Sequence, residues 1–366
     1  MALGFLLVGG LAALAGEGPW LALHLVLAGA LVLAISGVSL MLTVTWSAAP
    51  APPDRWVHAQ RLLVAVGAAG VALGRHAELP VGVVAAAGTA HLAGLLLLAG
   101  LLWVTVRSGV ERRFDAAVVA YEGALASGVV GVGIGITMAV DAPSAALRST
   151  HVAVNLLGLV GLVVGGTLPF FAATVGRSRL AAHATATRLL FTTGALAGAL
   201  VVAAVGLASE EAGLAQAGLV AYGATVLAVI SVMPRPTRRQ LRWAGPRLLG
   251  LWAGALWWVV ALVALAADVG RGSLPLSGPW VTVLVVAGYL QILWGSLAYL
   301  VPMLRGGGHE QLGAGFATTR SWLGLAAANA AGVALAVDAG PLAVAALVVW
   351  GVDTAVRLGL VLLPAR

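Results

Sequence analysis

The sequence predicts an all-α protein, a polytopic transmembrane helix bundle of about 12 spans with both termini in the cytoplasm. Hydrophobic residues make up 61% of the 366 residues and charged residues only 9%, whereas a soluble domain has about 25% charged residues. Apolar stretches of about 20 residues recur along the chain. Arginines gather in alternate connections between these stretches, as the positive-inside rule requires. The composition therefore excludes a soluble fold.

The apolar stretches define the spans in order. Their lengths predict helices over 2–16, 20–46, 56–75, 80–106, 115–140, 146–176, 183–208, 211–233, 243–267, 278–304, 316–337 and 341–363. We expect a single transmembrane domain over residues 1–366. The alternative is a subdivision at the cytoplasmic loop 234–247 into an eight-helix and a four-helix part. No convincing repeat of one part of the sequence in another is expected.

The distribution of charge sets the orientation. The connections after the even-numbered spans are rich in arginine, and the segment 233–247 alone carries five. The other connections carry acidic residues, namely Glu17, Glu78, Asp141, Glu210, Glu211, Asp268 and Asp338. Cytoplasmic loops are the ones enriched in basic residues. Both termini are therefore expected in the cytoplasm, which requires an even number of spans and supports counting the short first stretch.

The net charge of +7 follows from these loop arginines. We interpret it as orientation charge, so the expected partner is the lipid bilayer and not a nucleic acid. The chain has no cysteine, which excludes disulfides, iron–sulfur clusters and thiolate metal sites. All 20 basic residues are arginine. Together with the abundance of Ala and Gly this is typical of a high-GC bacterial genome, so a multi-pass protein of the bacterial plasma membrane is expected.

Histidines are the main candidates for a site. The predicted topology puts four of the seven in the outer half of the bundle, namely His24, His76, His91 and His151. Neutral imidazole is a common ligand of haem iron and copper. His24, His91 and His151 form the candidate cofactor-binding set, because two facing histidines can hold haem b and three can hold copper. His76 and Asn155 are further candidates at a metal site. The alternative is that each histidine is hydrogen-bonded within the bundle or lies at its interface.

Other polar residues in the spans need an explanation too, because burying them in a bilayer is costly. Asn155 can support His151 through a hydrogen bond, or it can tie two helices together, as Gln291 and Asn329 are expected to do. The glycines of segment 128–135 predict close helix packing.

Three of the charged residues within predicted spans are considered as candidates for a role of their own. Glu122 can serve a proton path, or it can meet water or an arginine near the interface. Asp353 and Arg357 are four residues apart and can neutralise each other on one helix face. No nucleophile–base arrangement, zinc motif or paired carboxylate is found, so catalytic residues are unknown and the question of an enzyme stays open.

Two segments carry a resemblance to a known family. Residues 151–179, HVAVNLLGLVGLVVGGTLPFFAATVGRSR, and residues 288–310, GYLQILWGSLAYLVPMLRGGGHE, resemble segments of the multi-pass membrane domains of actinobacterial copper nitrite reductase or multicopper-oxidase-like proteins. These domains are in turn distantly similar to nitric-oxide-response membrane proteins (NnrS-like) and to subunit I of haem-copper oxidases.

The resemblance implies a haem- or copper-binding membrane protein of respiration or nitrogen-oxide metabolism. His24 and His151 then fall in the second and sixth helices, where the oxidases place a haem ligand and a copper ligand. It also implies electron transfer with a copper or redox protein partner at the outer face. The chain departs from the oxidase pattern, since the seventh span has only His183 and the tenth has Gln291 and no histidine. A complete oxygen-reducing centre is therefore not expected.

Two other classes of function remain open. A transporter or permease suits twelve helices, although the interior has few charges and no clear pair of broken helices in corresponding places. A membrane scaffold subunit without a cofactor suits the glycine-rich helices.

Overall fold

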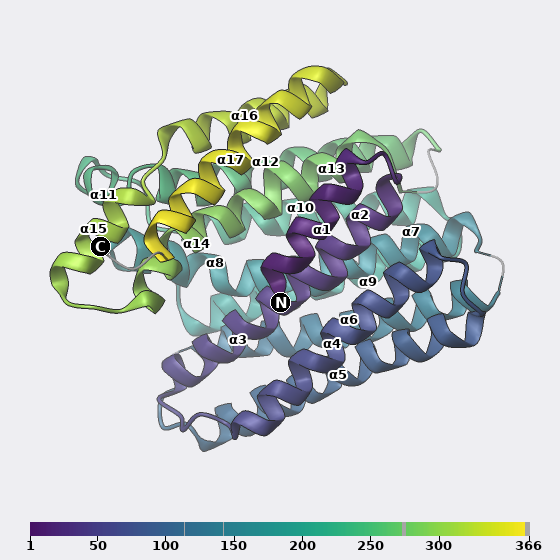
Figure 1. The fold of residues 1–366 in the computed structure, drawn as a ribbon, viewed down its shortest axis with the longest axis horizontal. Helices are drawn as coiled ribbons and strands as arrows, with labels where there is room; N and C mark the ends of the chain where they lie inside the picture. The colour runs from purple at the N-terminus through teal and green to yellow at the C-terminus, as the bar shows by residue number, and fades with distance from the viewer. Residues whose placement is uncertain (113, 142, 273–275, 363–366) are drawn as a thin grey trace. The chain divides into compact units, whose positions relative to one another are not determined.

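The computed structural model describes residues 1–112, 114–141, 143–272 and 276–362 (Figure 1). Every regular element in these ranges is helical. The chain forms two compact units, Met1–Gly166 with Leu207–Glu211, and Thr167–Gly206 with the chain from Ala212 onward.

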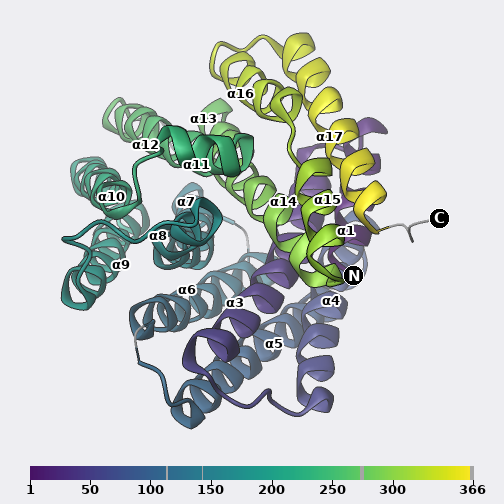
Figure 2. The same cartoon turned by 90° about the vertical axis from the view of Figure 1, so that its left-hand side faces the viewer.

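The first unit is built from helices that precede and include the start of α8. They are α1 (Ala2–Leu14), α2 (Pro19–His24), η1 (Leu25–Leu31), α3 (Val32–Ser47), α4 (Asp54–His76), α5 (Val81–Ser108), α6 (Asp115–Val140), α7 (Ala145–Ala153), η2 (Val154–Val160) and α8 (Gly161–Gly176). Helices α3, α4, α5 and α6 lie side by side in this unit (Figure 2).

The second unit contains the rest of α8 and the helices that follow it. They are α9 (Ala186–Ala208), α10 (Ala212–Val232), α11 (Arg238–Trp243), α12 (Pro246–Gly270), α13 (Pro279–Val283), η3 (Leu284–Leu290), α14 (Gln291–Arg305), α15 (His309–Thr318), α16 (Trp322–Ala336) and α17 (Gly340–Leu362). In it α12 packs on α10 and on α14, and α16 packs on α17.

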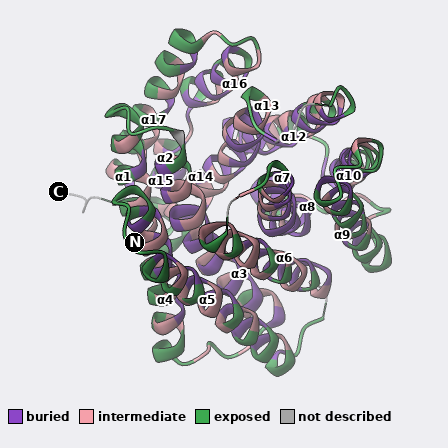
Figure 3. Cartoon of the chain, turned by 90° about the vertical axis from the view of Figure 1, so that its right-hand side faces the viewer, coloured by how far each residue is buried: buried purple, intermediate pink, exposed green. Residues whose placement is uncertain are grey.

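The structure confirms an all-α polytopic helix bundle. Ten continuous helices of the described chain are long and apolar enough to cross a membrane, and they coincide with the predicted second to tenth and twelfth spans. Much of α9 is exposed (Figure 3), and its exposed residues include the apolar Phe191 and Val201. Lipid can therefore cover these surfaces without leaving a polar group unsatisfied.

The first and eleventh predicted spans are shorter than expected. They correspond to α1, with 13 residues, and α16, with 15 residues, whereas a spanning helix needs about 20. The count of twelve and the cytoplasmic placement of both termini therefore stay predictions. The predicted end of the last span, residue 363, lies outside the described residues.

Three of the long helices contain a π-helical segment of 7 residues each, η1, η2 and η3. Their sequences are LVLAGAL, VNLLGLV and LVVAGYL, so each has glycine as its fifth residue. Seven residues after that glycine, each helix has a pair of small residues: Ser36–Gly37, Gly165–Gly166 and Gly295–Ser296. The tripeptide GPW also precedes both η1 and η3, at 18–20 and 278–280.

Each π segment packs on the helix at the other side of the preceding turn: η1 on α1, η2 on α6 and η3 on α12. At Gly29 the ring of Phe5 occupies the place of a side chain, since an added Cβ would lie 2.5 Å from Phe5 Cγ. The same helical hairpin with a π segment in its second helix thus occurs three times. This recurrence is one of structure, and the expectation that the sequence holds no convincing repeat stays a prediction. The repeated residues are small and few, in a chain rich in the same residue types.

Close backbone approach between α9 and α10 provides a test of the packing. A Cβ added at Gly218 would lie 2.6 Å from Ala203 Cα, whereas one added at Gly198 meets nothing within 4 Å. We expect Gly218→Ala to destabilise the protein, because overpacking typically costs about 1–3 kcal/mol. Gly198→Ala, the matched control on α9, keeps or raises stability. The apparent melting temperature in detergent measures both, and an equal response of the two variants would contradict the predicted contact.

Candidate functional site

His24 is the last residue of α2 and immediately precedes η1. Its Nδ1 lies 2.8 Å from the carbonyl oxygen of Trp20, one helical turn earlier. The imidazole also stacks on the Trp20 ring, with centroids 4.0 Å apart and planes 26° from parallel. Because a carbonyl can only accept, Nδ1 carries the proton and Nε2 keeps its lone pair.

His151 lies on α7, three residues before η2 begins. Its Nδ1 is 2.8 Å from the carbonyl oxygen of Gly131 on α6, so this ring also has its proton on Nδ1 and a free lone pair on Nε2. Gly135 of the same helix leaves room for the ring, since a Cβ there would lie 3.1 Å from His151 Cε1. Two glycines of the 128–135 segment therefore hold this histidine against α6.

Asn155 supports the same region from one turn later. Its Nδ2 donates to the carbonyl oxygen of His151 over 2.8 Å. A Cβ at Gly131 would lie 2.6 Å from Asn155 Cγ, so the asparagine fills the space that this glycine leaves open. Asn155 thus holds the backbone of His151 and packs against α6. The imidazole of His151 donates its own hydrogen bond to the carbonyl oxygen of Gly131.

The two histidines beside the π segments belong to the same compact unit. Both present an Nε2 lone pair, and each ring is fixed by a hydrogen bond from its other nitrogen to a backbone carbonyl. This is the arrangement that orients histidine ligands in metal sites.

His91 is buried on α5 and faces α4. Its Nδ1 lies 3.2 Å from the carbonyl oxygen of Val64. Gly67 allows the two helices to approach, since a Cβ there would lie 2.6 Å from His91 Cβ. Its polar contact thus ties α5 to α4, as the alternative interpretation of a hydrogen-bonded histidine describes.

His76 lies at the end of α4, at the surface. Its Nε2 is 3.6 Å from Glu17 Oε2, and the two side chains are 43% and 46% exposed. The pair connects α4 to the turn between α1 and α2. Within the described ranges no group of three or more histidine, aspartate, glutamate or cysteine side chains is close enough together to hold a metal ion. The structure therefore places His24 and His151 in one compact unit and gathers no three-ligand set among the described residues.

The buried amides behave differently from one another. Asn329 of α16 accepts a hydrogen bond from Trp257 Nε1 of α12 over 2.9 Å, so it ties two helices together as predicted. Gln291 begins α14, directly after η3, and is completely buried. Neither its Oε1 nor its Nε2 has a hydrogen-bond partner among the described residues. The sequence predicted a helix tie here, and no such contact is formed by its amide.

Glu122 of α6 has a buried Oε1 without a hydrogen-bond partner in the part of the chain that the structure describes. No arginine pairs with it there. The structure thus leaves Glu122 as an isolated carboxyl group, and the expectation of a proton path stays a prediction.

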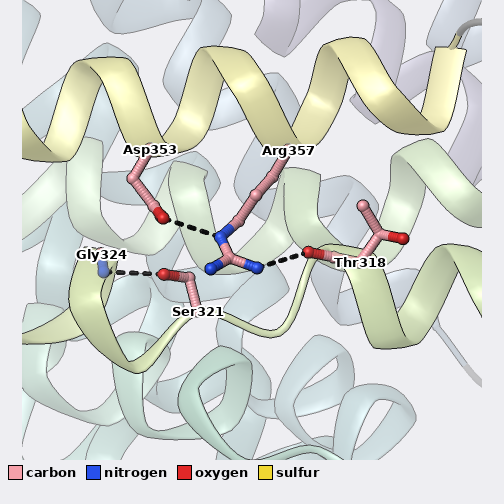
Figure 4. A network of polar contacts seen from close by, with 5 residues as sticks. All are labelled: Thr318, Ser321, Gly324, Asp353 and Arg357. Atoms are coloured by element: carbon pink, nitrogen blue, oxygen red, sulfur yellow. Dashed lines mark hydrogen bonds and ion pairs between the residues drawn. The ribbon is translucent and has the colours of Figure 1, made fainter.

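Asp353 and Arg357 form the predicted ion pair on α17. Arg357 Nε lies 2.7 Å from Asp353 Oδ1, and Arg357 Nη1 donates to the carbonyl oxygen of Thr318 over 2.9 Å. Close to this pair, the side chain of Ser321 accepts from the backbone nitrogen of Gly324 and caps α16 (Figure 4). The pair thereby holds α17 against the connection between α15 and α16.

Breaking this pair should cost stability. We expect Arg357→Met to destabilise the protein by about 2–3 kcal/mol, because it leaves the buried carboxylate of Asp353 without its cation. The expected loss is smaller than for a fully buried ion pair, because the side chain of Arg357 is 33% exposed, although that of Asp353 is only 8% exposed. The double variant Asp353→Leu/Arg357→Met should recover much of the loss, as thermal unfolding in detergent can measure. The interaction would be contradicted if the loss of stability in the double variant equalled the sum of the losses in Arg357→Met and Asp353→Leu.

The fold and these polar contacts define the class of protein: a polytopic α-helical membrane protein whose first unit has a histidine shortly before each of two π-helical segments. Comparison of the chain with protein-family models, with curated proteins and with solved structures finds no match.

Proposed function

We propose that this protein is a haem-binding membrane protein that transfers electrons in respiration or nitrogen-oxide metabolism, with His24 and His151 as the residues that would hold a haem b. The observation that carries the proposal is the shared state of the two imidazole rings, which belong to one compact unit. Each uses Nδ1 to donate to a backbone carbonyl at 2.8 Å and keeps Nε2 for a ligand. A haem held there would supply one-electron redox chemistry.

The donor set favours haem over a copper centre of three histidines. A haem iron needs one or two axial protein ligands, because the porphyrin supplies the other four. A copper site of three histidines needs His91 as well, and the described residues hold no group of three or more histidine, aspartate, glutamate or cysteine side chains close enough for a metal ion. His76 is paired with Glu17 at the surface. The roles of Asn155 and Trp20 are to fix the positions of the two ligands, through the backbone of His151 and the face of His24.

The surroundings of the two ligands also suit a cofactor. π-helical segments occur often at functional sites, because the extra residue in the turn redirects side chains and backbone carbonyls. Both histidines lie within a turn of such a segment. The charge pattern predicts that this end of the bundle lies at the outer face of the membrane. Electrons would pass there to or from a copper or redox protein.

The test is an absorption spectrum of the detergent-purified protein, oxidised and then reduced with dithionite, with iron and copper analysis of the same sample. We expect a Soret band and a reduced α band, both lost in His24→Ala and in His151→Ala because each variant removes one of the two histidines that would hold the haem. His58→Ala is the matched control. Its Nδ1 makes the same contact to a carbonyl one turn earlier, Asp54 at 2.9 Å, at the other end of the bundle.

Three outcomes would count against the proposal. Copper without haem would replace haem with copper and retain the site only if His24→Ala or His151→Ala removes the metal. Haem that persists in both variants would place the ligands elsewhere. A colourless, metal-free protein after growth with haem precursor and copper would overturn the proposal and leave the transporter and scaffold alternatives.

A further inference from the structure

A cavity of about 500 Å³ lies in the second unit, where α8 and α10 end and α11 begins. Polar side chains line much of it: Ser178, Arg179, His183, Ser231, Arg235 and Gln240. Buried Met233 and Pro234 form an apolar part of its wall. The cavity is on the arginine-rich side of the predicted topology, which the positive-inside rule assigns to the cytoplasm.

The charge around the cavity is positive and has no acidic counterpart in the lining. Arg179 and Arg235 are both exposed lining residues. From residue 142 to residue 247 the only acidic residues are Glu210 and Glu211, which lie between the opposite ends of α9 and α10. No carboxylate of this part of the sequence is therefore placed to neutralise the two guanidinium groups.

Nearby cations add to this positive potential. Arg247, at the start of α12, is 2% exposed, and its Nη1 has no hydrogen-bond partner among the described residues. Its other guanidinium nitrogens donate only to the carbonyl oxygens of Ala244 and Trp243. Arg177 stacks over the Trp243 ring, with 3.3 Å between its Cζ and the ring centroid. Arg247, which is buried without an anionic partner, and the exposed Arg177 raise the affinity of this end of the unit for an anion.

Neutral donors complete the lining. The buried Oγ of Ser178 has no hydrogen-bond partner in the described chain. Gln240 uses Oε1 to accept from the backbone nitrogen of Thr237 over 2.7 Å in the capping box of α11, so its amide nitrogen remains free to donate. The cavity thus combines two guanidinium groups, a hydroxyl and an amide N–H, all able to donate to oxygen.

We propose that this cavity binds a phosphate group. Arginine recognises phosphate through two parallel N–H···O bonds, and hydroxyl and amide donors satisfy the remaining oxygens. The group can belong to the headgroup of an anionic phospholipid of the inner leaflet, since basic pockets on the cytoplasmic side of membrane proteins bind such headgroups. It can equally belong to a free phosphate compound of the cytoplasm. The proposal does not depend on the histidine site.

The experiment measures the apparent melting temperature of the full-length protein in detergent during three titrations. The added compounds are phosphatidylglycerol, phosphatidylcholine with the same acyl chains, and inorganic phosphate. If phosphatidylglycerol stabilises the protein and phosphatidylcholine does not, the site binds a lipid headgroup. If inorganic phosphate alone stabilises the protein, the site binds a free phosphate compound. In either case Arg179→Gln/Arg235→Gln should raise the half-saturating concentration about tenfold or more.

The control is Arg238→Gln/Arg239→Gln, which removes the same charge from exposed positions of α11 that do not line the cavity. It should retain the wild-type response. If the arginine variant fails to fold, Ser178→Ala provides a smaller change to test. This variant should weaken the response. The proposal would be overturned if neither phosphatidylglycerol nor inorganic phosphate stabilised the protein. It would also be overturned if the two arginine double variants lost the response equally.

Discussion

Hydrogen bonds from side chains to backbone carbonyls are the interaction on which the polar residues of these helices depend. In an apolar environment each donor needs a partner within the protein. Ser36 donates to Val32 O and Thr43 to Ser39 O, each four residues earlier. The candidate ligand His24 follows the same rule within its own helix, while His151 reaches the carbonyl of Gly131 on α6. The rule fixes each imidazole in one tautomer, and this gives the histidine pair its chemical character.

Glycine makes the second set of contacts possible, because a carbonyl of one helix is accessible to a side chain of another only where the backbones approach closely. Gly67 admits His91 against α4, and Gly131 and Gly135 admit Asn155 and His151 against α6. Not every glycine has this role, since Gly133 of the same run faces nothing within 4 Å. Close packing and positioning of polar groups are therefore one property of these helices.

The three π-helical segments connect the repeat with the candidate site. Each lies in the second helix of a hairpin and has glycine at its fifth position. The first two hairpins carry a histidine within a turn of the segment, and the third carries the buried Gln291 just after it. The three polar residues do not occupy equivalent positions, since the histidines precede their segments by one and three residues and Gln291 follows its segment.

The sequence by itself determined the fold class, because an apolar composition and regular apolar stretches leave only helices able to satisfy the backbone in a bilayer. It also placed the Asp353–Arg357 pair, which depends only on helical spacing. Tertiary structure decided that His91 contacts α4 and that His151 contacts α6, since spacing along the chain does not report which helix faces meet. It decided the hairpin repeat as well, because π segments differ from α-helix by hydrogen-bond pattern and not by residue type. The phosphate cavity likewise comes from three segments, 178–183, 231–235 and Gln240, which only folding brings together.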